Sequence, residues 1–165
     1  MILTGPTIRR LAILEPHVSR SLAHGMSYGE SYAGYDIRLR DRMIVWPIFA
    51  RLGVSIEHFA MPDDVIGRVH DKSTLARRGV QVQNTIIEPG WRGYLTIEVT
   101  YTPLRWWKLW HVLPAGTPIA QVIFDRIDAP TAGYSGKYQD QPARPVAAAM
   151  EQPTGQKVAI VLERK

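Results

Sequence analysis

The sequence contains no cysteine, so neither a disulfide framework nor a cysteine-ligated metal site can form. It has no apolar run near the roughly 20 residues that a membrane span needs, and it does not begin like a signal peptide. No Walker A, GxGxxG or HExxH pattern occurs, although five histidines are present. We therefore expect a cytoplasmic protein with no membrane partner and no zinc.

The chain has 165 residues, of which 45% are hydrophobic and 21% charged, as in ordinary globular proteins of one domain. Its net charge is +5 and its pI about 9.7, which favours an anionic partner, either a nucleic acid or a polyphosphate. The basic residues form no long block, so nucleic acid is the less favoured partner.

Scattered glycine and proline indicate many short strands rather than long helices. A short helix is expected after Asp71, closed by Gly79, and an N-terminal helix within residues 7–22. Residues 25–34 are expected to form a loop. Alternating or apolar runs predict strands at residues 35–39, 54–59, 65–70, 80–87, 94–101 and 118–124. The fold class is therefore mainly β, a barrel or sandwich, with a β domain over residues 1–128. Residues 129–165, rich in Pro, Gly, Gln and Ala, are expected to form a flexible tail.

The segment Lys72-Ser73-Thr74-Leu75-Ala76-Arg77 is the first candidate site. If Ser73 opens a helix, its free backbone N–H groups and hydroxyls would attract an anion, and Lys72 would add charge. Ser73 and Arg77 are four residues apart and share a helix face. The alternative is a capped surface turn with a solvated basic face.

Glu98 is the second candidate. It lies in the run Tyr94–Tyr101, on the face opposite Leu95, Ile97 and Val99. In an open sheet that face is solvent and Glu98 is a surface carboxylate. In a closed barrel or at a subunit interface the same carboxylate could serve as a general base.

Residues 134–141 are the third candidate, in which Lys137 and Gln141 could grip phosphate oxygens while flanking glycines act as hinges. The alternative is a disordered polar tail. Trp106, Trp107 and Trp110 could stack nucleic-acid bases, but their position just before a strand favours packing or an interface.

These segments, in this order, resemble the dCTP deaminase family, whose fold is the dUTPase-like distorted β-barrel or jelly roll. The resemblance covers residues 27–141. It rests on Ala33-Gly34-Tyr35-Asp36-Ile37-Arg38-Leu39, residues 67–79, Glu88-Pro89-Gly90-Trp91-Arg92-Gly93, residues 94–98, Ile119-Ala120-Gln121-Val122-Ile123-Phe124 and residues 136–141. The stretch between Arg42 and Ala50 is shorter than is usual in the family, residues 105–110 are not typical of it, and residues 154–165 have no counterpart.

The resemblance implies zinc-independent hydrolysis of dCTP to dUTP by a homotrimer whose sites combine residues of neighbouring subunits. Glu98 would be the base, Ser73 would position the water, and Arg77 would lie beside the reacting base. Magnesium would arrive with the triphosphate. The residues that would hold the nucleotide are Lys72, Thr74, Glu88, Gln121, Tyr134, Lys137 and Gln141.

Two other functions remain open. One is dUTP diphosphatase activity, alone or combined with deamination, in which water activated near Glu88 would attack phosphorus. The other is a non-catalytic, nucleotide-binding regulatory protein on the same fold.

Overall fold

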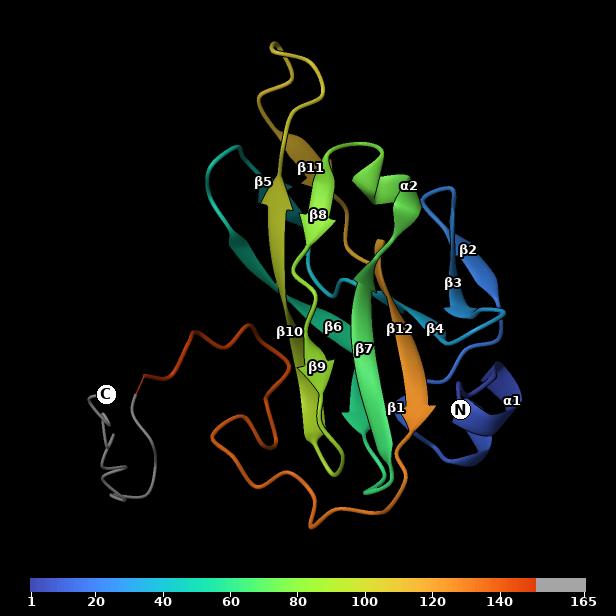
Figure 1. The fold of residues 1–165 in the computed structure, drawn as a ribbon. Helices are drawn as coiled ribbons and strands as arrows, with labels where there is room; N and C mark the ends of the chain where they lie inside the picture. Colours follow the sequence, from blue (N-terminus) through green and yellow to red (C-terminus); the bar gives the residue numbers. More distant parts are fainter. Residues whose placement is uncertain (151–165) are drawn as a thin grey trace, which may run out of the picture.

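The computed structural model describes residues 1–150 of the chain. It confirms a mainly β protein with two short helices, α1 (Gly5–Arg10) and α2 (Ser73–Ala76) (Figure 1). In this part of the chain no helix has the length and apolar character to cross a membrane.

Most strands belong to two sheets. The first contains, in spatial order, β1 (Leu14–Glu15), β6 (Arg51–Ala60), β10 (Arg92–Tyr101) and β8 (Val80–Val82). The second contains β2 (Ser21–Ala23), β3 (Met26–Glu30), β4 (Tyr35–Arg38), β12 (Pro118–Arg126), β7 (Val65–Asp71) and β9 (Ile86–Ile87). A separate ribbon pairs β5 (Met43–Val45) with β11 (His111–Leu113). Within residues 1–150 the sheets do not close on themselves. The fold is therefore the jelly-roll form of the expected architecture and not a closed barrel.

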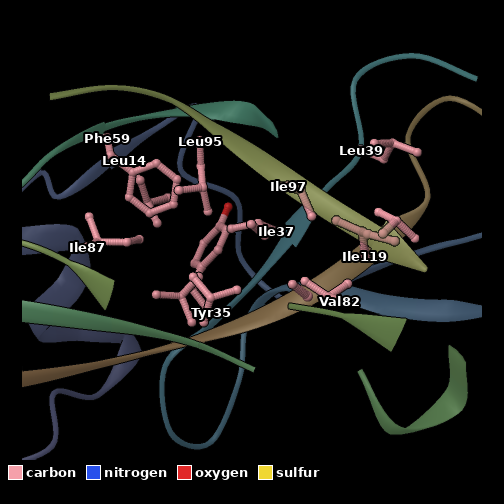
Figure 2. Packing of buried hydrophobic residues seen from close by; sticks show 14 of the residues in the cluster. Leu14, Tyr35, Ile37, Leu39, Phe59, Val82, Ile87, Leu95, Ile97 and Ile119 are labelled. Carbon is pink, nitrogen blue, oxygen red and sulfur yellow. The ribbon is translucent and has the colours of Figure 1, made fainter. Parts of the chain in front are cut away.

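The core lies between the two sheets (Figure 2). Phe59 of β6 and Phe124 of β12 approach across it, with ring centroids 6.5 Å apart. Along β10, Leu95, Ile97 and Val99 are buried as the alternation predicted. Burial of these side chains stabilises the sandwich by about 1.5–3 kcal/mol each, relative to exposure. Glu98 is thereby held on the opposite face of a well-packed strand.

A register shift between Tyr94 and Thr96 interrupts the pairing of β10 with β6. Such a shift leaves backbone groups without ladder partners. The fully buried Ser55 hydroxyl fills the gap: it accepts a hydrogen bond from the Leu95 N–H at 2.9 Å and donates one to the Glu57 carbonyl at 2.6 Å. Ser55 therefore fixes the register in which Thr96 and Glu98 reach the outer face.

Several expected boundaries were wrong. The N-terminal helix ends at Arg10, because Ile13 and Leu14 are buried and Leu14 pairs with Phe59 of β6. The loop expected at residues 25–34 contains β3, which pairs with β2 and β4 despite its glycine. The single strand expected at residues 80–87 is two strands, β8 and β9, in different sheets. Pairing with strands that are distant in the sequence, which the local pattern does not record, decides where each of these elements begins and ends.

Helix α2 has neither of the caps expected. Lys72 occupies the N-cap position without a side-chain hydrogen bond, and Ser73 is the first helical residue. Asp71 instead accepts a hydrogen bond from the Val82 N–H at 2.6 Å. Gly79 closes the turn as predicted, at φ +84°, where a Cβ atom would lie 2.0 Å from the Thr102 carbonyl oxygen.

Candidate functional site

A hollow of about 420 Å³ opens on the outer face of β10. Its walls come from β10, β9 and the chain segment that follows Gly133. Four of the residues singled out in the sequence border it: Glu88, Glu98, Tyr134 and Gln141. The structure therefore brings these residues, which are up to 53 positions apart, around one concave surface.

Glu98 is half-buried at the edge of this hollow, next to Leu52 across the sheet. Its backbone carbonyl accepts a hydrogen bond from the Gln83 N–H at 2.9 Å, which fixes the strand on that side. Its side chain makes no hydrogen bond or ion pair within residues 1–150. A carboxylate held rigidly beside a hollow, with no cation to neutralise it, can accept a proton from a bound water.

The segment Tyr134–Gln141 packs against the start of β10. The Trp91 Nε1–H donates to the Tyr138 carbonyl at 2.7 Å, and the Arg92 N–H donates to Gln139 Oε1 at 2.9 Å. Gln141 forms a β-bridge with Gly93, whose φ is +140° and where a Cβ atom would lie only 2.5 Å from the Gln141 nitrogen. Of the predicted tail, residues 129–150 include this docked segment, and residues 151–165 lie outside the described residues.

Thr96 joins β10 to the tail. It lies two residues before Glu98 on the same strand face and is only 8% exposed. Its hydroxyl donates to Gln141 Oε1 and accepts from the Val146 N–H, both at 3.1 Å. Sequence reasoning missed Thr96, although its position two residues from Glu98 placed it on the outer face.

We expect Thr96→Val to loosen this attachment while leaving the strand intact, because valine has the same shape but can neither donate nor accept. Each of the two lost bonds should contribute about 0.5–1.5 kcal/mol to the attachment. Hydrogen exchange should therefore accelerate at Val146 and its neighbours. Unchanged exchange there, with exchange in β12 as the internal reference, would contradict the attachment.

Ser73 and Thr74 of α2 and Arg77, its C-cap, form a second group, and all three are exposed. None of them borders the hollow. The Arg77 N–H donates to the Ser73 carbonyl at 3.0 Å, so the two residues lie one turn apart as the spacing predicted. The group presents two hydroxyls and a guanidinium to the surroundings of the helix.

Lys72 precedes this helix and is tied to β4. Its Nζ atom lies 2.6 Å from Asp36 Oδ2, and both side chains are nearly buried. Asp36 alternates with the apolar Tyr35 and Ile37, a pattern that predicts an outward face, but it is only 6% exposed because Lys72 covers it. Gln121 pairs with Asp36 across β12 and β4, and its Nε2 donates to Ser31 Oγ and the Ala33 carbonyl. Lys72 and Gln121 thus lie near α2 and away from the hollow.

Lys137 is exposed and belongs to neither group in this chain. Its ammonium lies 5.0 Å from the centroid of the Tyr138 ring and contacts the Ala149 carbonyl. Tyr138 itself borders the hollow, so Lys137 lies beside its rim.

A single chain therefore presents the predicted site in two parts. The carboxylate part contains Glu88 and Glu98 and lies under the tail, whereas the cationic part lies at α2 and its two flanking residues (Figure 1). Within residues 1–150, no three His, Asp or Glu side chains converge as metal ligands would.

Comparison of the chain with protein families and solved structures shows which family it belongs to. A family model described as dCTP deaminase-like matches residues 35–127, which is more than half of the chain. The chain belongs to the dCTP deaminase-like family.

The chain is 33% identical to a dCTP deaminase of Roseiflexus castenholzii, over 81% of this chain and 89% of that protein. It is 34% identical to a dCTP deaminase of Campylobacter fetus, over 78% of this chain and 86% of that protein. Among solved structures, a 2'-deoxycytidine 5'-triphosphate deaminase from Agrobacterium tumefaciens shares the fold, with a TM-score of 0.58 and 16% identity over 76% of this chain and 47% of that one. A dUTPase of EIAV also shares the fold, with a TM-score of 0.53 and 16% identity over 77% and 98% of the two chains.

Proposed function

We propose that this protein is a hydrolase that removes the exocyclic amine of dCTP, giving dUTP and ammonia without zinc. The observation that carries the proposal is the carboxylate of Glu98 at the edge of the hollow, which has no partner within residues 1–150, in a chain of this family. One face of β10 is packed in the core and fixes the strand, while Glu98 lies on the other face, where no cation neutralises its carboxylate within residues 1–150.

In the proposed reaction Glu98 takes a proton from water as the water oxygen bonds to C4 of the cytosine. The same proton then passes to the C4 amine, the C–N bond breaks, and ammonia leaves, while the proton that remains on the added oxygen moves to N3 and leaves the C4 carbonyl of uracil. Ser73 would orient the water, and Arg77 would stabilise the negative charge that develops on the base.

The cationic part of the site would hold the triphosphate. Lys72 and Thr74 would contact the phosphates, together with Gln121 of β12. Glu88, Tyr134 and Gln141 would close the carboxylate part. The magnesium proposed here would bind the phosphate oxygens, because the described residues offer no three-ligand set of their own. We also place the protein in the cytoplasm, with its nucleotide substrate.

We further propose a homotrimer. The two parts of the site lie apart in one chain, and a neighbouring copy could bring its α2 to the hollow. Sedimentation at micromolar concentration should give a single species of three times the mass of the chain. A monomer that is nevertheless active would contradict a site shared between subunits.

Lys137→Ala is expected to weaken dCTP binding more than it slows turnover of bound substrate. Loss of one charge-assisted contact should cost on the order of 1–3 kcal/mol in affinity. Isothermal titration calorimetry would measure the affinity for dCTP, with Glu98→Gln also present in each protein so that the substrate is not turned over. Lys108→Ala, which changes a lysine on another loop, is the control. An unchanged affinity would remove Lys137 from the site.

Incubation with dCTP and magnesium, followed by chromatography, tests the activity. The proposal predicts dUTP and ammonia in equal amounts. Release of dUMP would instead favour the second candidate, hydrolysis of dUTP or of both nucleotides, which the position of Glu88 on the wall of the hollow supports. Binding without any product would favour the regulatory protein.

A further inference from the structure

Two loops at one end of the molecule expose an unusual set of side chains. The turn after β5 contributes Trp46, Ile48 and Phe49, and the loop after β10 contributes residues 104–110, Leu-Arg-Trp-Trp-Lys-Leu-Trp. We call residues 46–49 and 104–110 the aromatic–basic tip. The second loop projects beyond the ends of the sheets (Figure 1).

The tip is one surface, because its two loops touch. Rings of Trp46 and Trp110 lie 5.6 Å apart, and β5 pairs with β11 just below them. The Tyr101 hydroxyl donates to the Lys108 carbonyl at 3.0 Å, which anchors the longer loop to the end of β10. The apolar side chains of the two loops therefore form one surface, which is anchored to the ends of β5, β10 and β11.

These apolar side chains are outside the core. Trp106 is 83% exposed and Ile48 95% exposed, and Phe49, Leu104 and Leu109 are also exposed. Ile48 moreover has a φ of +66°, a backbone conformation that is costly for a β-branched residue. Packing or an interface was expected of Trp106, Trp107 and Trp110, and within residues 1–150 all three stay more than half exposed, which leaves the interface. Contiguous exposed apolar patches of this kind mark surfaces that bind something.

The charge of the tip has one sign. No Asp or Glu occurs in residues 42–56 or 99–124. Arg51, Arg78, Arg105 and Lys108 are exposed around the tip, and none of them forms an ion pair within residues 1–150. Burial, together with Lys108 and Arg78, lowers the pKa of His111 at the base of the longer loop, which is consistent with a positive local potential.

We propose that the aromatic–basic tip binds the surface of a bilayer that contains anionic lipids. Tryptophan prefers the boundary between headgroups and acyl chains, leucine, isoleucine and phenylalanine insert below it, and cations pair with lipid phosphates. No membrane partner was expected from the sequence because no apolar segment is long enough to span a bilayer. Binding to the bilayer surface needs no such segment.

Other occupants fit less well. The aliphatic side chains of Ile48, Leu104 and Leu109 have no role against nucleic-acid phosphates. Association of two tips about a twofold axis would bring like charges together with no carboxylate to pair them. Both remain outcomes of the test below.

The test is co-sedimentation of the full chain with vesicles of phosphatidylcholine alone or mixed equally with phosphatidylglycerol. We expect binding to the mixed vesicles only, and an at least ~10-fold loss of binding in the double variant Trp106→Ser, Trp107→Ser. Tyr32→Ser is the matched control, because Tyr32 is also a highly exposed aromatic residue, lies on the turn between β3 and β4, and has the Arg20 guanidinium over its ring. It should bind as the parent does.

Several outcomes would overturn the proposal. These are absence of binding to mixed vesicles, equal binding by the double variant, and tight binding of a DNA duplex that the double variant loses. A change of sedimentation coefficient in the double variant, without vesicles, would assign the tip to a contact between copies. Deaminase activity and the circular dichroism spectrum of the double variant should equal those of the parent, so the result is independent of the proposed reaction.

Discussion

Glu98→Gln should lower the turnover of dCTP by at least about 100-fold, the usual scale for losing a positioned acid–base group. Glutamine keeps the size of the side chain and can form hydrogen bonds, but it cannot take the proton from water. Leu95, Ile97 and Val99 pack the strand from its other face, so the fold should survive. Rapid-quench assays at saturating dCTP would measure the loss.

Two further measurements separate chemistry from structure. Thr100→Val changes the same face of β10 two residues further along, outside the hollow, and should leave turnover close to that of the parent. The Glu98→Gln protein should still bind dCTP and keep its oligomeric state. Near-normal turnover in this variant would exclude Glu98 as the base, whereas loss of folding would show a structural carboxylate.

The largest effect on stability should come from Glu57→Ala. Glu57 is fully buried on β6 and joins the two sheets, because both the backbone N–H and the Nε–H of Arg38 on β4 donate to it, at 2.9 and 2.8 Å. Burial raises the pKa of Glu57, while the hydrogen bonds from Arg38 oppose that rise. Removing the carboxylate leaves the nearly buried guanidinium of Arg38 without its partner.

Breaking such a pair typically costs about 3–5 kcal/mol. Urea unfolding monitored by tryptophan fluorescence should show this loss in the free energy of unfolding. Glu15→Ala is the control, since Glu15 lies on β1 beside the same strand but is exposed, and should change stability by less than about 0.5 kcal/mol. A similarly small loss in Glu57→Ala would mean that the two sheets are held together by apolar packing alone.

The elements that could be predicted are those whose periodicity reflects burial within one sheet. Strand β10 was predicted almost to its ends because its alternation records one face in the core and one outside. The face of Glu98 followed from the same pattern. The helix after Asp71 was found from the change in period and from Gly79.

What the sequence could not predict depends on contacts between distant segments. Short strands such as β5 and β11 exist because partners are available, and three residues carry too little periodicity to show it. The burial of Asp36 depends on Lys72, 36 positions away. The role of Thr96 depends on where the tail lies. Each is a long-range pairing that local patterns do not record.

The central claim is that water attacks C4 of the base, assisted by Glu98. Its most direct test is turnover of dCTP in water enriched in oxygen-18, followed by mass spectrometry of the nucleotide product and its fragments. The account predicts one heavy oxygen in the uracil base, as the carbonyl oxygen on C4, and none in the phosphates. Heavy oxygen in the phosphate products, with an unlabelled base, would contradict it and assign the hollow to phosphate hydrolysis.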